Sequence, residues 1–128
     1  MLRKVGPDGP AKYNYHFKHM TTVGEPIEPE VWRWYHKVVG KGEAVIVDTW
    51  WQTETGGFLG SSLPALKPMK PGSCGPAVIG IYPVIYDEEG HEVPAGKAGN
   101  ICIRNPWPGI MQTIWGQPER FVDVYYKK

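Results

Sequence analysis

Ten consecutive residues of this chain combine large aromatic rings with groups that bond phosphate, amide or metal. Residues 48–57 read Asp-Thr-Trp-Trp-Gln-Thr-Glu-Thr-Gly-Gly. The apolar residues 44–47 before them are explained by packing, but adjacent tryptophans that run into hydroxyls, a carboxylate and glycines make an unusual core segment. We therefore predict a binding site here, for a ligand with a flat part, an apolar part and an anionic part.

Taken alone, three of these residues also have a simpler interpretation. Trp50 and Trp51 could be core rings, because aromatic residues after a strand usually pack. Glu54 could be a solvated surface acid, which is the commoner place for a glutamate. From the residue types, both alternatives stay open.

The elements that must position this segment read as strand, helix, strand. Residues 19–23 form a short predicted strand that ends at Gly24, where the missing side chain lets another group approach the backbone. A helix is predicted from Pro29, with apolar side chains at helical spacing up to Gly40, and residues 44–47 read as a strand of a parallel sheet. Because ligands bind beyond the carboxyl ends of such strands, we expect the residues after both strands to meet at one edge.

The second half of the chain is rich in turns. The 16 Gly and 13 Pro are concentrated after Gly56 and favour short strands over long helices. The fold prediction is therefore α/β: a βαβ part of a parallel sheet followed by a small, partial antiparallel β-barrel. The expected pieces are a connector (61–75), strands (78–86, 91–93 and 100–104), a hairpin turn (87–90) and a helix from Pro118 with Phe121, Val122 and Tyr125 on one face.

These elements divide the chain into three expected regions. Residues 1–60 would be the end of an α/β subdomain, residues 61–75 the connector, and residues 76–128 a β-rich subdomain. We found no internal repeat.

Other polar clusters are assigned no chemistry. His16 and His19 lack further partners with metal-ligand spacing, and the acids of residues 87–89 fit a polar turn. Cys74 and Cys102 are far apart in the chain and form no C-x-x-C pair, so we expect reduced thiols.

Charge and hydropathy exclude several partners. The net charge is +1, from 14 basic and 13 acidic residues spread along the chain, which leaves no footprint for nucleic acid or an anionic membrane. No apolar run approaches the roughly 20 residues that span a bilayer. We expect a soluble, cytoplasmic location.

Three blocks of sequence together carry a family resemblance. Residues 23–27 read Val-Gly-Glu-Pro-Ile, residues 48–57 are the aromatic segment above, and residues 107–109 read Trp-Pro-Gly. In order and spacing they resemble AMP-forming acetyl-CoA synthetases, a family of the adenylate-forming acyl/aryl-CoA ligase superfamily. The resemblance covers essentially the whole chain, whereas such enzymes are several times longer. It implies an internal fragment of the large N-terminal domain.

The resemblance also implies site residues and ligands. The ligands would be ATP or AMP, Mg²⁺, acetate and CoA, with most of the CoA site outside this chain. Thr53 would meet the α-phosphate and Glu54 would help to hold Mg²⁺, so these two would be the catalytic residues. Val23 and Trp51 would wall an acyl pocket sized for acetate, with propionate tolerated. The nucleotide would be surrounded by Gly24, Glu25, Pro26, Asp48, Thr49, Trp50, Trp51, Gln52 and Thr53.

Two functions remain open at this stage. The first is part of an acetate-CoA ligase that makes acetyl-AMP from acetate and ATP and then acetyl-CoA. The family's phosphate loop, ribose-binding acid and C-terminal domain have no counterpart in the chain. The chain would then be a piece made by truncation or by gene splitting, and in the second case a complementing polypeptide would supply the missing parts. The alternative is a non-enzymatic nucleotide-binding or structural remnant or subunit without turnover.

Residues 13–20 depart from the family pattern, which leaves the start of the first strand open.

Overall fold

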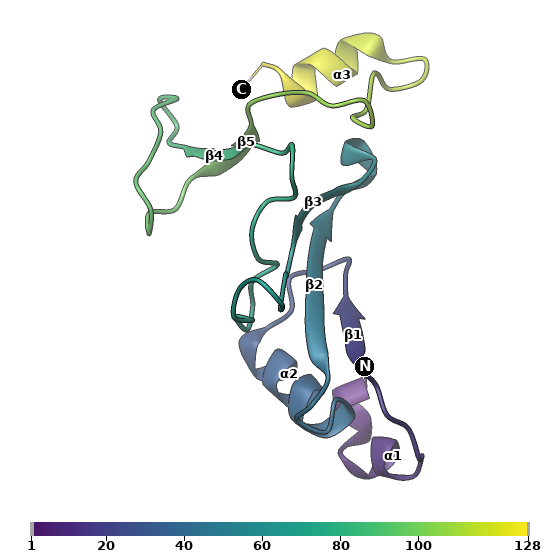
Figure 1. Ribbon diagram of the computed structural model, residues 1–128. Coiled ribbons are helices and arrows are strands. Elements are labelled where there is room, and N and C mark those ends of the chain that lie inside the picture. Colours follow the sequence, from purple (N-terminus) through teal and green to yellow (C-terminus); the bar gives the residue numbers. More distant parts are fainter. Residues whose placement is uncertain (1, 128) are drawn as a thin grey trace. The chain divides into compact units, whose positions relative to one another are not determined.

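A computed structural model describes residues 2–127, and these fall into two compact units (Figure 1). The first unit ends at Trp51 and resumes over Phe58–Ile81. The second unit comprises Gln52–Gly57 and the chain from Tyr82 onward. The aromatic segment thus contributes its first four residues to one unit and the rest to the other.

A three-stranded sheet in the order β1-β2-β3 organises the first unit. Strand β1 (His19–Thr22) lies parallel to the first half of β2 (Val45–Trp51), with Thr22 opposite Asp48. Strand β3 (Phe58–Ser61) pairs antiparallel with the second half of β2, and the register shifts between Trp50 and Trp51. The middle strand therefore changes partner near Asp48.

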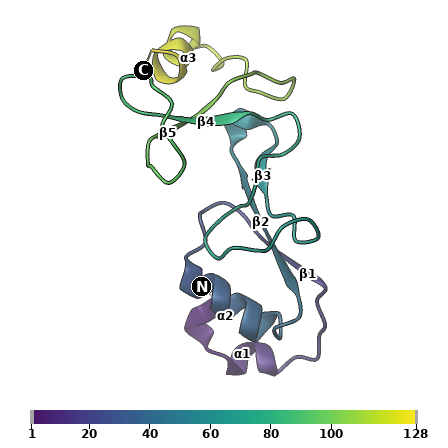
Figure 2. The ribbon, with the colours of Figure 1, turned by 60° about the vertical axis from the view of Figure 1, so that its left-hand side comes forward.

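The helix between β1 and β2 covers the sheet with its apolar side. It begins as α2 (Pro29–Trp34) and continues as a π-helical turn (Tyr35–Val39), in which the Gly40 N–H reaches back to the Tyr35 carbonyl at 2.9 Å. Figures 1 and 2 show α2 lying beside the first half of β2. The buried core of this unit consists of Met20, Trp32, Val39, Ala44 and Ile46. The predicted βαβ arrangement is confirmed.

Gly40 has a steric role at the end of this helix. Its backbone is right-handed, but a Cβ there would lie 2.6 Å from Met20 Cε and 2.7 Å from the His36 carbonyl oxygen. The left-handed turn falls on Lys41 and Gly42 instead. The expected stop at Gly40 is correct: the helix ends there because the chain turns at Lys41 and Gly42, and close packing leaves no room for a side chain at position 40.

Short helical turns precede the sheet. A 3₁₀ turn (Leu2–Val5) and α1 (Asp8–Ala11) lead into an irregular stretch before β1.

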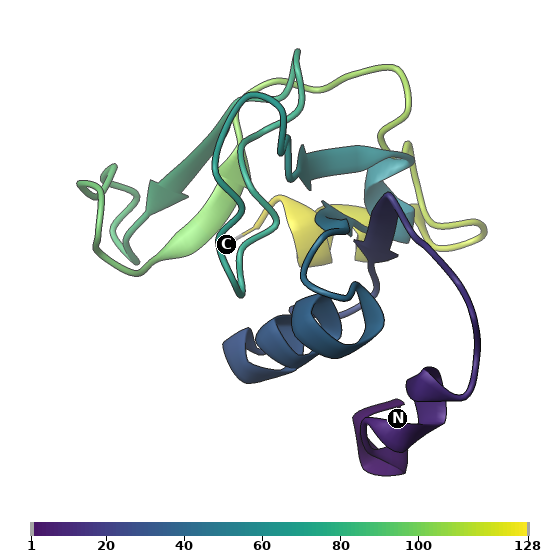
Figure 3. The same ribbon diagram turned by 60° about the horizontal axis from the view of Figure 1, so that its bottom comes forward.

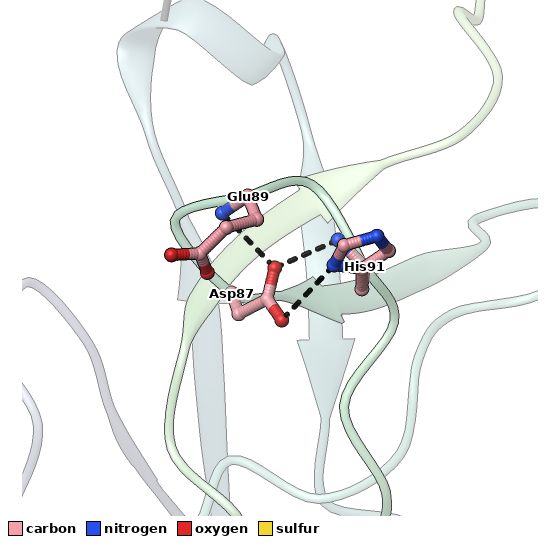
Figure 4. Close-up of polar contacts among 3 residues, drawn as sticks. All are labelled: Asp87, Glu89 and His91. Atoms are coloured by element: carbon pink, nitrogen blue, oxygen red, sulfur yellow. Dashed lines mark hydrogen bonds and ion pairs between the residues drawn. The ribbon is translucent and has the colours of Figure 1, made fainter.

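The second unit is built around a two-stranded ribbon. Strand β4 (Pro83–Tyr86) pairs antiparallel with β5 (Asn100–Ile103), in the green part of the chain in Figure 3. In the turn after β4, Asp87 Oδ1 accepts hydrogen bonds from the N–H groups of Glu89 and His91 (Figure 4). Helix α3 (Pro118–Tyr125) follows and buries none of its residues within the chain. The polar hairpin turn and the last helix are confirmed.

Three sequence-based expectations about strands need correction. The second strand does not end at residue 47: β2 runs on to Trp51, because β3, which was not predicted, pairs with its second half. The strand expected over residues 78–86 is reduced to β4, because Val78 accepts a turn hydrogen bond from Ile81. The short strand at residues 91–93 is one bridge between Tyr86 and Glu92.

The sheets of residues 2–127 are open, and no closed barrel is formed among them. The same residues contain no helix with the length and apolar character needed to cross a membrane.

Candidate functional site

In the first unit, Asp48 lies in the middle of β2 and bonds it to the end of β1. Its side chain is 4% exposed, and Oδ1 accepts a hydrogen bond from the Thr22 hydroxyl at 2.5 Å and another from the Thr49 N–H at 3.1 Å. The Thr49 hydroxyl donates to the Thr22 carbonyl at 3.0 Å. These bonds fix the position where the chain leaves β1 toward residues 23–26.

The residues beyond β1 are open to solvent. Val23 is 55% exposed, and Gly24 has a φ of 97°, a conformation that favours glycine. Glu25 and Pro26 are exposed as well. Thr22 lies opposite Asp48, so the chain enters residues 24–26 beside the start of the aromatic segment.

The two tryptophans of β2 differ in burial. Trp50 is half-buried, whereas Trp51 is 45% exposed and meets Phe58 edge-to-face, with ring centroids 6.4 Å apart. Trp51 is therefore no core ring within the first unit.

In the second unit, residues 52–57 form a tight turn around Thr55. A 3₁₀ turn (Thr53–Thr55) is closed by a capping interaction in which the Gln52 N–H donates to Thr55 Oγ1 at 2.9 Å. The Thr55 hydroxyl lies 2.8 Å from the Gln52 carbonyl and 2.9 Å from the Gly57 carbonyl, either of which can accept its proton. Thr55 is 6% exposed, while Thr53 is exposed and Glu54 half-exposed. The turn buries its third residue and presents the first two.

A loop from much later in the chain holds this turn from outside. The Trp107 indole N–H donates to the Thr55 carbonyl at 2.9 Å, and the Met111 N–H donates to the Glu54 carbonyl at 2.8 Å. Gly56 has a φ of 60°, and a Cβ on it would lie 2.0 Å from the Gly109 carbonyl oxygen. Residues 107–109 thus support the turn that carries Thr53 and Glu54.

The Glu54 carboxylate has one partner of its own. The Tyr125 hydroxyl of α3 donates to Glu54 Oε1 at 3.0 Å. This hydrogen bond to a carboxylate is the main reason that the pKa of Tyr125 is raised above its usual value, since it favours the protonated phenol.

Metal ligands do not cluster in residues 2–127. No group of three or more His, Cys, Asp or Glu side chains in that range could hold an ion. His16 and His19 are both exposed. Cys74 and Cys102 are free thiols, and burial, followed by the charge of Asp48, raises the pKa of Cys74.

These two arrangements can be compared with known proteins. A family described as "AMP-binding enzyme" matches residues 1–115. The chain belongs to the AMP-binding enzyme family. This confirms the resemblance drawn from residues 23–27, 48–57 and 107–109.

Curated relatives within the AMP-binding enzyme family share about half of the residues. The chain is 47% identical over 127 residues to the acetyl-coenzyme A synthetase of Wolinella succinogenes, covering 98% of this chain and 19% of that protein. It is 53% identical over 105 residues to the acetyl-coenzyme A synthetase of Burkholderia lata, covering 82% of this chain and 16% of that protein. The chain therefore spans about a fifth of the length of these relatives.

Solved structures show the same fold. An anthranilate CoA ligase, AuaEII, in complex with anthranoyl-AMP matches with a TM-score of 0.71 and 25% identity, covering 85% of this chain and 20% of that one. An acyl-CoA synthetase from Brucella canis matches with a TM-score of 0.66 and 33% identity, covering 80% and 18%. The chain has the fold of part of an adenylate-forming ligase.

The structure divides the predicted site residues between the two units. In the first unit, Thr22, which precedes residues 23–26, is hydrogen-bonded to Asp48 and Thr49, and Trp50 and Trp51 continue the same strand. In the second unit the structure brings Gln52, Thr53 and Glu54 together on one turn.

Several supporting residues were not recognised from the sequence. They are Thr55, Gly56, Gly109, Met111 and Tyr125, together with the function of the Trp107 indole. The one sequence signal for this support was the Trp-Pro-Gly block at residues 107–109, which is part of the family resemblance but was given no role in the site. Nothing in its local pattern pointed to a partner more than 50 residues earlier.

Proposed function

We propose that this chain is part of an AMP-forming acetate-CoA ligase. The reaction would activate acetate with ATP to acetyl-AMP, releasing pyrophosphate, and transfer the acetyl group to CoA. The observation that carries the proposal is the 47% identity over 127 residues to an acetyl-coenzyme A synthetase, which spans all three sequence blocks. The two local arrangements support it, because the first exposes residues 23–26 and Trp51 and the second exposes Gln52 and Thr53.

The first unit would contribute walls for the adenine and acyl groups. Gly24, Glu25 and Pro26 are exposed after β1, where a flat ring can approach the backbone. Asp48 and Thr49 would act mainly through their main chain, since their side chains are bonded to β1.

Trp50 and Trp51 would then flank the nucleotide and the acyl group. Trp51 and Val23 are exposed enough to line an acyl pocket. An indole at its end leaves room for a methyl or ethyl group, and each methylene contributes about 1–3 kcal/mol to discrimination.

The second unit would contribute the groups that meet the phosphates. Gln52 and Thr53 are exposed, and a hydroxyl can donate to the α-phosphate, where negative charge gathers in the transition state.

Glu54 would hold Mg²⁺, a cation that neutralises charge on the polyphosphate. A single carboxylate suffices, because Mg²⁺ in such sites takes one or two carboxylates and completes its shell with phosphate and water. Tyr125 must then release Glu54 Oε1 or share it.

The remaining parts of the proposal concern the longer protein and the organisation of the chain. CoA would bind mostly to segments that the longer relatives have, and so would the triphosphate. Strands β4 and β5 would belong to a barrel that further segments complete. A complementing polypeptide and a cytoplasmic location form part of the same proposal, as does the division into residues 1–60, 61–75 and 76–128.

A chimera tests the function directly. In the Wolinella succinogenes synthetase, this chain replaces the matching 127-residue stretch, and acetate-dependent exchange between ATP and pyrophosphate is measured. Exchange that requires acetate and falls by at least about a hundredfold with Glu54→Gln supports the proposal. A folded chimera that exchanges with a bulkier acid but not with acetate contradicts it.

The isolated chain tests the alternative of a binding module. Calorimetry with a stable acetyl-adenylate analogue and Mg²⁺, with Trp51→Ala as control, measures whether the chain alone keeps a formed pocket. Micromolar binding that the substitution abolishes indicates a nucleotide-binding module. No heat, together with an active chimera, assigns the function to the longer enzyme only.

A further inference from the structure

We propose that Trp107 is a positioning residue, which sets the geometry of the Thr53–Thr55 turn through its indole N–H. The importance of this turn for catalysis rests on the proposed function. The contacts between Trp107 and the turn are observed independently of that function. All residues concerned belong to the second unit.

The turn is short of internal bonds. Its three residues are closed by the Thr55 N–H on the Gln52 carbonyl at 3.1 Å and the Gly56 N–H on the Thr53 carbonyl at 3.3 Å. The Thr55 side chain adds the capping interaction. Short 3₁₀ segments have weak hydrogen-bond geometry, so a turn of this length depends on outside support.

That support comes from the loop of residues 107–111 and reaches three consecutive residues, Glu54, Thr55 and Gly56. The Glu54 carbonyl accepts from the Met111 N–H, the Thr55 carbonyl accepts from the Trp107 indole, and Gly56 lies against the Gly109 carbonyl. Each contact uses main-chain atoms of the turn. None of these three contacts uses the hydroxyl of Thr53 or the carboxylate of Glu54, whose partner is the Tyr125 hydroxyl.

Trp107 supplies the one side-chain donor among these contacts. Tryptophan combines a large apolar ring with a single N–H donor, and buried indoles usually bond through it. Trp107 is half-buried, in contrast to Trp115, whose side chain is 94% exposed in the same unit. Trp115 therefore offers a matched control for the loss of an indole.

The kinetic test uses the chimera described above. Trp107→Phe keeps an aromatic ring and removes the donor, and it should lower kcat for acetate-dependent exchange about five- to tenfold, as expected for one lost hydrogen bond. The Mg²⁺ concentration for half-maximal rate should rise by a similar factor, while the KM for acetate changes less than about twofold. Trp115→Phe should change none of these values.

Two outcomes overturn the proposal. One is a Trp107→Phe chimera with the kinetics of Trp115→Phe. The other is a loss that appears only as a lower Tm, with kcat and the Mg²⁺ dependence unchanged in the folded enzyme. An unsubstituted chimera without exchange contradicts the proposed function instead.

A second experiment tests the contact without activity and without a change of ring size. In the 128-residue chain, β-(3-benzothienyl)alanine at position 107 replaces the indole N–H by sulfur. Amide hydrogen exchange of Thr55 and Gly56 should accelerate about five- to tenfold relative to the unsubstituted chain. Unchanged exchange at these two amides rejects the positioning role, even if Trp107→Phe fails to fold.

Discussion

The two halves of the aromatic segment are held in opposite ways. Where β1 ends beside the middle of β2, side chains hold the backbone: the Asp48 carboxylate accepts a hydrogen bond from the Thr22 hydroxyl and is almost fully buried. In the turn that follows, main-chain groups are held by a distant loop, and the side chains of Thr53 and Glu54 face solvent wholly or in part.

This difference separates residues that belong to one sequence block. Asp48 and Glu54 are acids of the same ten-residue segment. The Asp48 carboxylate accepts two internal hydrogen bonds, whereas the Glu54 carboxylate has a single partner, Tyr125 of α3. Changes near Asp48 should therefore reduce stability first. Substitutions of Trp51 or Glu54, whose side chains are at least partly exposed, should alter ligand binding more than stability.

The largest effect is expected where the backbone fit of the turn is tightest. Gly56→Ala places a methyl group 2.0 Å from the Gly109 carbonyl oxygen at a φ of 60°. The strain and the displacement together should lower the free energy of unfolding by about 3 kcal/mol. Urea unfolding of the chain, followed by tryptophan fluorescence, measures this.

Gly57→Ala is the matched control, since a Cβ there would meet no atom within 4 Å. It should change the free energy of unfolding by less than about 0.5 kcal/mol. Equal losses in the two variants would show that the turn is not held by this fit.

The second effect concerns the buried carboxylate. Asp48→Ala removes the acceptor of the Thr22 hydroxyl and the Thr49 N–H and should cost about 2 kcal/mol of unfolding free energy. Asp48→Asn keeps one acceptor oxygen and should cost about half as much. Both are measured by urea unfolding, with adenylate-analogue binding as a second readout. A stable Asp48→Asn variant that loses binding would break the comparison, because the side chain would then contact the ligand.

Sequence reasoning could predict the elements whose pattern is local. The helix from Pro29 has apolar residues at helical spacing, the hairpin turn has its acids and Gly90, and the apolar residues before Asp48 read as a parallel strand. These were correct because each is determined within one short stretch.

It could not predict what depends on distant partners. Strand β2 extends to Trp51 only because Phe58–Ser61 returns along it, and a sequence of Phe-Leu-Gly-Ser is too short to signal a strand. The support of the turn by Trp107 and Gly109 is equally nonlocal. The site residues were named from a family resemblance, and their roles stay predictions. The residues that hold them in place could be recognised only from the structure.

A third and smaller effect concerns specificity in the first unit. Trp51→Gly removes a ring that is 45% exposed, so the fold should lose little. In the chimera, the ratio of kcat/KM for propionate and butyrate to that for acetate should rise about tenfold for each methylene. Trp115→Gly removes a similarly large ring from the second unit and should leave the ratio unchanged. Unchanged selectivity with Trp51→Gly would remove Trp51 from the acyl pocket.

The smallest effect is expected at the one side chain that engages Glu54. Tyr125 has a raised pKa, so its bond to Glu54 contributes most below the usual tyrosine pKa of about 10 and is lost as the pH rises through the raised value. Tyr125→Phe should therefore lower the Mg²⁺ concentration for half-maximal rate by about twofold at neutral pH, because Glu54 is freed. Tyr126→Phe, which removes an exposed hydroxyl from the next residue, should leave it unchanged. Tyr125→Phe could instead raise the Mg²⁺ concentration for half-maximal rate, as Trp107→Phe is expected to do. The phenol would then position Glu54 rather than compete with Mg²⁺ for it. In that case the Glu54 side chain would be held by internal bonds, as the Asp48 side chain is.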